Sequence, residues 1–181
     1  MKFRIYTSNF KGNAKNCFYP NCIEIGNADD MKKAALYDHV CSYFNDSKRS
    51  IANFKSSNVI VMDCDNDHSN EPDKWLTSDL IEAYFPDVNY VLVTSRNNNK
   101  VKGNACARPR FHIYFPIDET TDTNDYAQIK KVFLKNTVSL PKMQLTPQGP
   151  FLATMLVLFG TKVAAILHHI FNSRLEQRQM K

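Results

Sequence analysis

The chain has 181 residues, of which 43% are apolar and 23% are charged, a composition that excludes a disordered, collagen-like or coiled-coil protein. Its net charge of +5 is uneven, because residues 1–90 carry ten basic and thirteen acidic side chains, whereas residues 91–181 carry thirteen basic and five acidic ones. The basic second half predicts an anionic partner. The first residues lack the apolar core of a signal peptide, so we expect a cytosolic protein.

The predicted elements alternate between strands and helices. Phe3–Thr7 is expected to be a strand, and a polar loop rich in glycine and asparagine follows it. Residues 30–44 carry an apolar stripe at helical spacing, with Asp29 or Asp30 as the capping residue. Residues 58–63 are rich in β-branched side chains and predict a buried strand.

The same alternation continues after a polar loop. Residues 77–85 predict a helix capped by Thr77 or Ser78. Tyr90–Ser95 predicts a strand, residues 110–115 another, and residues 122–135 a helix. Strands interleaved with helices predict an α+β domain, of mixed α/β character, around a central sheet.

The character of the chain changes at about residue 138. Residues 139–150 contain three prolines and predict irregular structure, and an apolar run over residues 151–171 follows. That run is long enough to span a bilayer, but Lys162 near its middle argues against spanning, and we expect a buried or partner-seeking helix. We therefore divide the chain into a main domain, 1–138, and an atypical tail, 139–181.

The five cysteines are odd in number and form no Cys-x-x-Cys pair, which argues against a secreted disulfide framework. Cys17, Cys22, His39 and Cys41 have the residue types of a zinc site, but their spacing is not a common one. The sequence favours reduced cysteines over zinc. His39 falls inside an expected helix, where a capping or core role is the more common one.

The most specific motif is the acidic end of the strand at residues 58–63. Asp63 and Asp65 point to the same face there, where carboxylates hold one or two hard divalent cations. Two such cations clamp the attacking and leaving oxygens of a phosphoryl transfer. A calcium loop is excluded, because its sixth residue would be His68 and its twelfth Lys74. The alternative without chemistry is an acidic turn cap.

A basic segment follows about thirty residues later. Residues 96–112 carry five basic side chains and no acidic one. In the strand at 110–115, His112 and Tyr114 share one face, and Phe111 and Ile113 share the other. Opposite a metal-bound carboxylate pair, such residues bind a triphosphate; alone, a strand histidine is more often structural. The candidate phosphate-binding residues are Ser95, Arg96, Lys100, Lys102, Arg108 and Arg110, and the candidate catalytic residues are Asp63, Asp65 and His112.

These motifs, in this order, resemble the archaeo-eukaryotic primase superfamily, in particular the primase-polymerase-like domains of phage and mobile-element replication proteins. That family has an acidic motif at a strand end and a later histidine strand, and its phage-type members have further runs similar to those of this chain. The matching segments are 59–65, 66–69, 93–97 and 107–117. The resemblance covers about residues 1–135, and Arg110 departs from the small, serine-like residue that is usual there.

The resemblance implies metal-dependent, template-directed nucleotidyl transfer. Asp63 and Asp65 would hold Mg²⁺ or Mn²⁺, and His112 with Arg110 and Arg108 would bind the incoming nucleoside triphosphate. The basic loop 96–102 would follow the phosphates of a single-stranded DNA template. A replicative helicase is an implied partner, and no membrane is expected. Two alternatives stay open: an inactive remnant that binds nucleic acid or a replication partner, and a metal-dependent nuclease.

One feature of the family is missing from this chain. The family supplies a third acidic metal ligand from a later strand, whereas the last acidic residue after Asp125 is Glu176 in the tail. A reading frame displaced by one base near residues 142–149 permits an acidic motif of the family's type. Our hypothesis is therefore that the chain is truncated or frameshifted after about residue 138.

Overall fold

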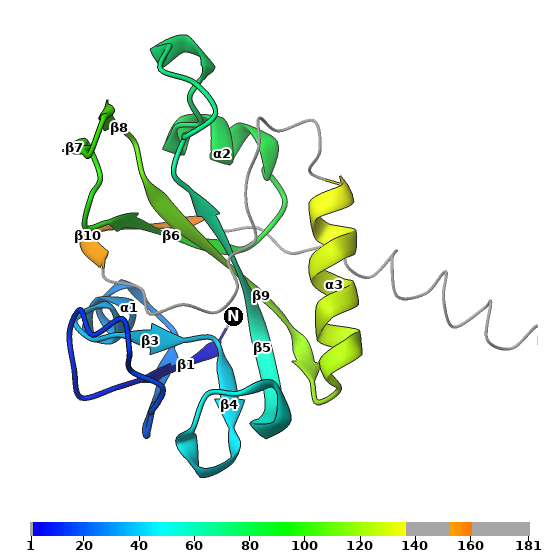
Figure 1. Cartoon of the computed structure of the whole chain (residues 1–181). Helices are drawn as coiled ribbons and strands as arrows, with labels where there is room; N and C mark the ends of the chain where they lie inside the picture. Colours follow the sequence, from blue (N-terminus) through cyan, green and yellow to red (C-terminus); the bar gives the residue numbers. More distant parts are fainter. Residues whose placement is uncertain (1, 137–152, 161–181) are drawn as a thin grey trace, which may run out of the picture.

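The structure, a computed structural model, describes residues 2–136 and 153–160. Its centre is an antiparallel five-stranded sheet in the order β10-β6-β9-β5-β4 (Figure 1). In chain order these strands are β4 (Ser42–Phe44), β5 (Phe54–Cys64), β6 (Tyr90–Ser95), β9 (Phe111–Thr120) and β10 (Ala153–Gly160). Helices and strands are both present, which confirms the expected α+β character.

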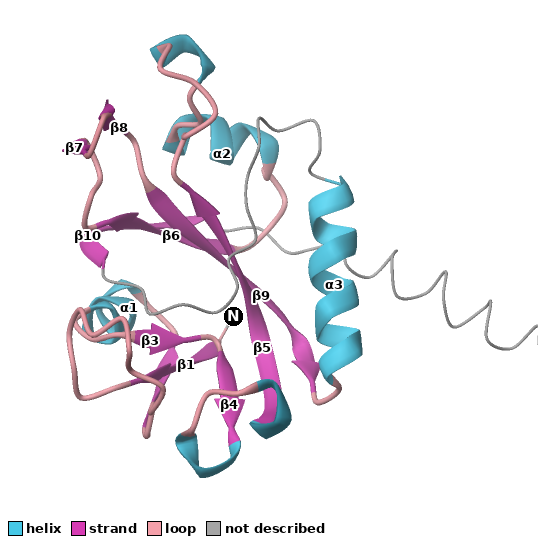
Figure 2. Cartoon of the chain, in the orientation of Figure 1, coloured by secondary structure: helices cyan, strands magenta, loops and turns pink. Residues whose placement is uncertain are grey.

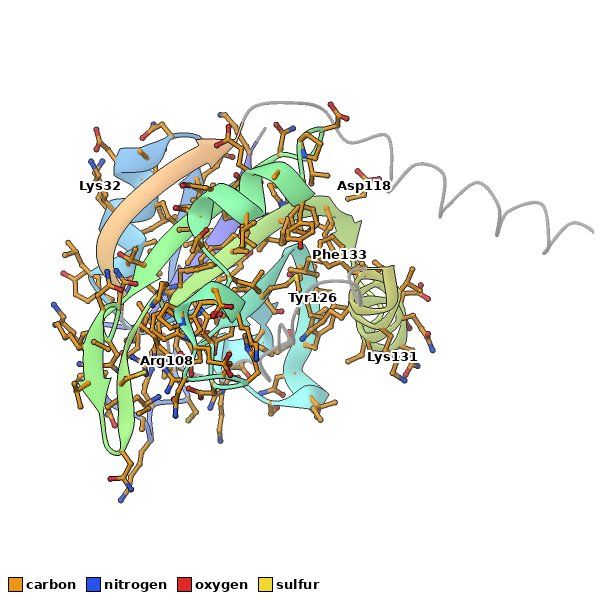
Figure 3. The ribbon with its side chains drawn as sticks, turned by 90° about the horizontal axis from the view of Figure 1, so that it is seen from above. Lys32, Arg108, Asp118, Tyr126, Lys131 and Phe133 are labelled. Carbon is orange, nitrogen blue, oxygen red and sulfur yellow. The ribbon has the colours of Figure 1, made fainter. Side chains whose placement is uncertain are left out.

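One face of the central sheet is covered by the helices α2 (Ser78–Tyr84) and α3 (Thr123–Asn136). Tyr126 and Phe133 lie between α3 and the sheet, whereas Lys131 lies on the outer side of the helix (Figure 3). The Tyr126 hydroxyl also donates a hydrogen bond to the main-chain oxygen of Val59 on β5. Burial of aromatic and aliphatic groups on this face supplies the first hydrophobic core.

The opposite face is covered by a smaller unit from the N-terminal part of the chain (Figure 2). It consists of a three-stranded sheet in the order β2-β1-β3 and one helix. Its elements are β1 (Phe3–Thr7), β2 (Asn21–Ile25), α1 (Ala28–Ala35) and β3 (His39–Val40). Phe3, Ile5 and Met31 of this unit pack against the valines and Tyr114 of the central sheet. This second core is continuous with the face on which Asp63 and His112 lie.

A hairpin stands at one end of the central sheet, between β6 and β9. Its strands are β7 (Lys100–Lys102) and β8 (Ala105–Arg108). The segment that follows β5 includes a short 3-10 turn at Pro72–Lys74 and projects from the same end of the sheet (Figure 1). Two further 3-10 turns, Asn45–Ser47 and Ile51–Asn53, connect β4 with β5. The end of β5 and the start of β9 thus lie at the base of two projecting segments.

The prediction of one helix over residues 30–44 is wrong. The Asn27 side chain caps α1 by accepting from the main-chain N–H groups of Asp29 and Asp30, and the helix ends at Ala35. Residues 39–44 instead form β3 and β4, which hydrogen-bond to β1 and β5. Sheet pairing with distant strands outweighs local helical periodicity here, as tertiary contacts commonly do.

Part of the apolar run in the tail is also a strand rather than the expected helix. β10 pairs with β6, with Val157 opposite Val93 and Leu158 opposite Leu92. A short apolar run fits a buried strand and a buried helix equally well, and periodicity does not separate the two. Residues 139–150 and 161–171, for which we also made predictions, lie outside the described residues. Within the described ranges, no helix is long and apolar enough to cross a membrane.

The other predicted elements are confirmed. β1 and β6 have the expected bounds, α2 is capped by Thr77, whose side chain accepts from the main-chain N–H of Leu80, and α3 covers the expected residues. β5 and β9 are longer than predicted. β2 was missed, because it directly follows a polar loop and four of its five residues are at least partly exposed.

Candidate functional site

The predicted carboxylates and histidine come together at the ends of two neighbouring central strands. Asp63 on β5 lies directly opposite His112 on β9, and His112 lies opposite Val93 on β6. Asp63 Oδ1 and His112 Nδ1 are 3.2 Å apart. Both side chains are largely shielded from solvent, at 18% and 7% exposure. The antiparallel register, a long-range property of the sheet, thus makes the acidic motif and the histidine strand one site.

The two aspartates of the motif differ in their surroundings. Asp63 Oδ1 is buried and accepts no hydrogen bond within the described part of the chain, an arrangement that costs free energy unless a cation or donor satisfies it. Asp65 is one third exposed. Burial raises the pKa of Asp65, the neighbouring Asp63 carboxylate raises it further, and Lys102 lowers it. A carboxylate whose charge is disfavoured by a neighbouring carboxylate is suited to sharing a cation with it.

Two basic groups lie next to Asp65. Lys102 Nζ on the β7–β8 hairpin is 3.8 Å from Asp65 Oδ2, and Arg110 Nε is 3.8 Å from Asp65 Oδ1. Lys102 is about half exposed, whereas the Arg110 side chain is completely buried. Arg110 Nη1 donates to the main-chain oxygens of Asn97 and Lys100, at 3.0 and 2.8 Å. Arg110 therefore connects the base of the hairpin to the acidic motif.

Arg108 lies slightly outside this group and is engaged with the segment that follows β5. Its Nη1 donates to the main-chain oxygens of Asn66 and Ser69, and its Nη2 donates to Asn70 Oδ1 at 2.9 Å. Nη1 is also 3.6 Å from Asp67. The side chain is 3% exposed; Figure 3 marks its position. In this arrangement Arg108 anchors the 66–70 loop, and its hydrogen bonds would have to open before it reached a phosphate.

The remaining predicted phosphate-binding residues lie around the same hairpin. The Ser95 main-chain N–H donates to the main-chain oxygen of Arg110, and its hydroxyl accepts from the N–H of Asn97. Arg96 and Lys100 are exposed to solvent. The structure therefore places Lys102 and Arg110 against the carboxylates, Ser95 beside Arg110, and Arg96 and Lys100 on the outer surface.

A buried histidine–tyrosine pair lies on the face of β9 that carries His112. Its members are His39 on β3 and Tyr114, two residues after His112, both fully shielded from solvent. His39 Nδ1 is 3.0 Å from the main-chain oxygen of Tyr37, which only accepts, so Nδ1 carries the proton. His39 Nε2 then accepts from the Tyr114 hydroxyl at 2.9 Å. Burial lowers the pKa of His39 to about 4, so the ring is neutral at pH 7.

This pair was not predicted as part of the site, since the helix expected over 30–44 hid the strand that carries His39. The core role favoured for His39 is confirmed by its burial. A lone histidine followed by a valine carries no signal of sheet pairing. One signal could have indicated the pair. Tyr114 shares a face with His112 in a predicted core strand, and a buried tyrosine hydroxyl usually has a hydrogen-bond partner.

The zinc alternative is not supported by the structure. Cys17 and Cys22 are exposed, and Cys41 is buried. Burial raises the pKa of Cys41 to about 12, so its thiol stays protonated at neutral pH and is a poor zinc ligand. Among the described residues, no group of three or more His, Cys, Asp or Glu side chains could hold a metal ion by itself.

The two aspartates nevertheless fit a magnesium or manganese ion that arrives with a nucleotide. Mg²⁺ is usually bound by one or two carboxylates together with substrate phosphates and water, rather than by an all-protein cage. Asp63 supplies a buried carboxylate oxygen that accepts no hydrogen bond within the described residues. Asp65 supplies a second carboxylate, which is close enough for the charge of Asp63 to raise its pKa. Two carboxylates of this kind are the donor set that such a site requires from the protein.

Comparisons with protein-family models, with curated proteins and with solved structures found no match for this chain.

Proposed function

We propose that the chain binds a nucleoside triphosphate together with Mg²⁺ or Mn²⁺ and transfers its nucleotidyl group on a single-stranded DNA template. The motifs that resemble the primase-polymerase-like domains suggest this reaction. The observation that supports it most is the meeting of Asp63, Asp65 and His112 at one end of the sheet, with Lys102 and Arg110 beside them. A cytosolic location and a replicative helicase as partner belong to the same proposal.

Asp63 and Asp65 would hold the divalent cation. When bound, such an ion favours the deprotonated 3′-hydroxyl and neutralises the charge that develops on the pyrophosphate. His112 lies beside the Asp63 carboxylate, with Nδ1 3.2 Å from Oδ1, and in this proposal its ring borders the triphosphate. Both groups stand on rigid strands of the central sheet, where positions are held more precisely than on loops.

The cationic residues take separate roles in this proposal. Lys102, on the hairpin, neutralises the triphosphate, and the exposed Arg96 and Lys100 contact the phosphates of the template strand. Arg110 is fully buried, so we assign it to balancing the charge of Asp65 and holding the hairpin base, with Ser95 beside it. Arg108 holds the 66–70 loop and acts on the site only through that loop.

The test is nucleotide incorporation on a primed single-stranded template with Mg²⁺ or Mn²⁺. We expect Asp63→Asn and Asp65→Asn to reduce incorporation by at least about a hundredfold, as removal of a charge-stabilising group does. Asp118→Asn is the matched control, since Asp118 is exposed near the far end of β9 (Figure 3). Incorporation that is unchanged by either site substitution would contradict the proposal.

A second candidate function is binding of nucleic acid without synthesis. It is favoured by one observation: within the described residues no three side chains of metal-ligating type form a group that could hold a metal ion, whereas the resembling family has three acidic ligands. This alternative predicts salt-sensitive binding of single strands and no incorporation with either cation. Cutting of DNA with Mn²⁺ and no nucleotide would instead indicate a nuclease.

A further inference from the structure

A second group of basic and aromatic side chains lies away from the carboxylates, around the 8–20 loop that joins β1 to β2. Three aromatic residues of this region are about half exposed: Phe10 at 54%, Phe18 at 49% and Tyr37 at 42%. The lysines Lys11, Lys15 and Lys48 are exposed as well. We call these six residues the aromatic–basic surface.

The backbone brings the parts of this surface together from three segments. The main-chain N–H of Asp38 donates to the oxygen of Phe10, which places Tyr37 next to Phe10. At the other end of the loop, Phe18 forms an antiparallel bridge with Lys48. Phe10 thus has Lys11 as its chain neighbour, Phe18 has Lys48 across the bridge, and Tyr37 lies beside Phe10.

The loop is also held in one shape. The buried carboxylate of Asp38 accepts from the main-chain N–H groups of Gly12 and Asn13, at 2.7 and 2.8 Å. Gly12 has φ of 79°, a conformation that other residues adopt only with strain. A surface that is ordered before binding loses less conformational entropy on binding.

The charge of the loop selects the kind of partner. Residues 8–23 contain no acidic side chain. Within the described part of the chain, Lys11, Lys15 and Lys48 form no ion pair, whereas Lys2 and Lys32 pair with acidic neighbours. Unpaired lysines next to exposed aromatic rings are suited to a chain of phosphates that carries flat bases. A partner protein would more commonly meet mixed charges and a closed apolar core.

We propose that the aromatic–basic surface binds single-stranded DNA, with bases stacked on Phe10, Phe18 and Tyr37 and phosphates paired with the lysines. This inference rests on the proposed function, in which the bound strand is the template. The surface is structurally linked to the site, because Asp38 and His39 are consecutive and His39 contacts Tyr114 on the strand of His112.

The experiment is fluorescence anisotropy of a labelled oligothymidylate with the full chain, in chelator and without nucleotide, so that the metal site does not contribute. Stacking of one base is worth about 1–3 kcal/mol, so we expect Phe10→Ala and Tyr37→Ala each to weaken binding by about five- to 150-fold. The matched control is Tyr84→Ala, because Tyr84 on α2 is 45% exposed and lies outside the surface. Retained thermal unfolding temperatures show that each variant is folded.

Two further measurements distinguish the contribution of base stacking to DNA binding from that of phosphate contacts. An abasic oligonucleotide is expected to bind the wild type more weakly than oligothymidylate, and Phe10→Ala is expected to reduce that difference. Lys11→Ala and Lys15→Ala are each expected to lower the logarithmic salt slope by about 0.7. Unchanged affinity of the aromatic variants, an equal loss in Tyr84→Ala, or absence of binding at low salt would each overturn the inference.

Incorporation and DNA-binding measurements on two variants distinguish failure of this inference from failure of the proposed function. Asp63→Asn is expected to lose incorporation but to bind oligothymidylate as the wild type does. If Asp63→Asn loses incorporation and Phe10→Ala binds DNA with unchanged affinity, the proposed function is supported and the proposed role of the aromatic–basic surface is contradicted. If Phe10→Ala binds DNA more weakly and Asp63→Asn leaves incorporation unaffected, the role of the surface is supported and the proposed function is contradicted.

Discussion

Acidification is expected to destabilise this protein through His39. The ring is fully buried, and burial lowers its pKa to about 4, against 6.5 for an exposed histidine. The unfolded chain therefore binds a proton between pH 6.5 and 4 that the folded chain does not. The stabilisation is present above pH 6.5 and is lost as the pH falls toward 4. A pKa difference of about 2.5 corresponds to roughly 3 kcal/mol of unfolding free energy.

The assay is urea denaturation at several pH values between 4 and 7, on the wild type and on His39→Gln. Glutamine does not titrate, and its amide retains a donor for the Tyr37 oxygen and an acceptor for the Tyr114 hydroxyl. All other titrating groups are common to both proteins, so the difference between the two curves isolates His39. We expect the wild type to lose roughly 3 kcal/mol more than His39→Gln over this range. Parallel curves would refute the assignment of a buried neutral ring.

Two further predictions concern groups that hold the segments around the site. Arg110→Met is expected to lower the unfolding free energy by about 2–4 kcal/mol, because two hydrogen bonds from a charged donor to the 97–100 turn are lost; equal urea midpoints would contradict this role. Asn66→Ala is expected to cost about 3 kcal/mol by the same measurement, since the Asn66 amide makes three bonds to the backbone of Leu76 and Pro109. Asn66→Asp retains the acceptor for the Leu76 N–H but places a buried carboxylate oxygen against the Leu76 and Pro109 carbonyl oxygens, so it should lose at least as much as alanine; a smaller loss would argue against the two donated bonds.

The parts of the fold that could be predicted are those whose signal is local. β6 and α2 have a clear apolar pattern or a capping threonine, and both lie where the sequence indicates them. β3 and β10 depend on hydrogen bonds to partners far away in the chain. Short apolar runs do not encode that choice, so a helix was expected in each place.

In the candidate site, too, the local features could be predicted from the sequence and the long-range features could not. The faces of the strands predicted that Asp63 and Asp65 lie together and that His112 shares a face with Tyr114. The register that places Asp63 opposite His112 is a property of the assembled sheet. The complete burial of Arg110 could not be predicted, because an arginine in a basic segment is expected to be exposed. Its buried guanidinium donates to the main-chain oxygens of Asn97 and Lys100, which belong to a different segment of the chain.

Our central proposal is that Asp63 and Asp65 share one divalent cation with a nucleoside triphosphate. It is tested most directly by electron paramagnetic resonance titration of Mn²⁺, with and without a non-hydrolysable deoxynucleoside triphosphate. We predict that Mn²⁺ binds to the wild type together with the nucleotide. Its affinity should fall at least tenfold in Asp63→Asn and in Asp65→Asn, but not in Asp118→Asn. Equal Mn²⁺ affinity in the wild type and both site variants would contradict the account.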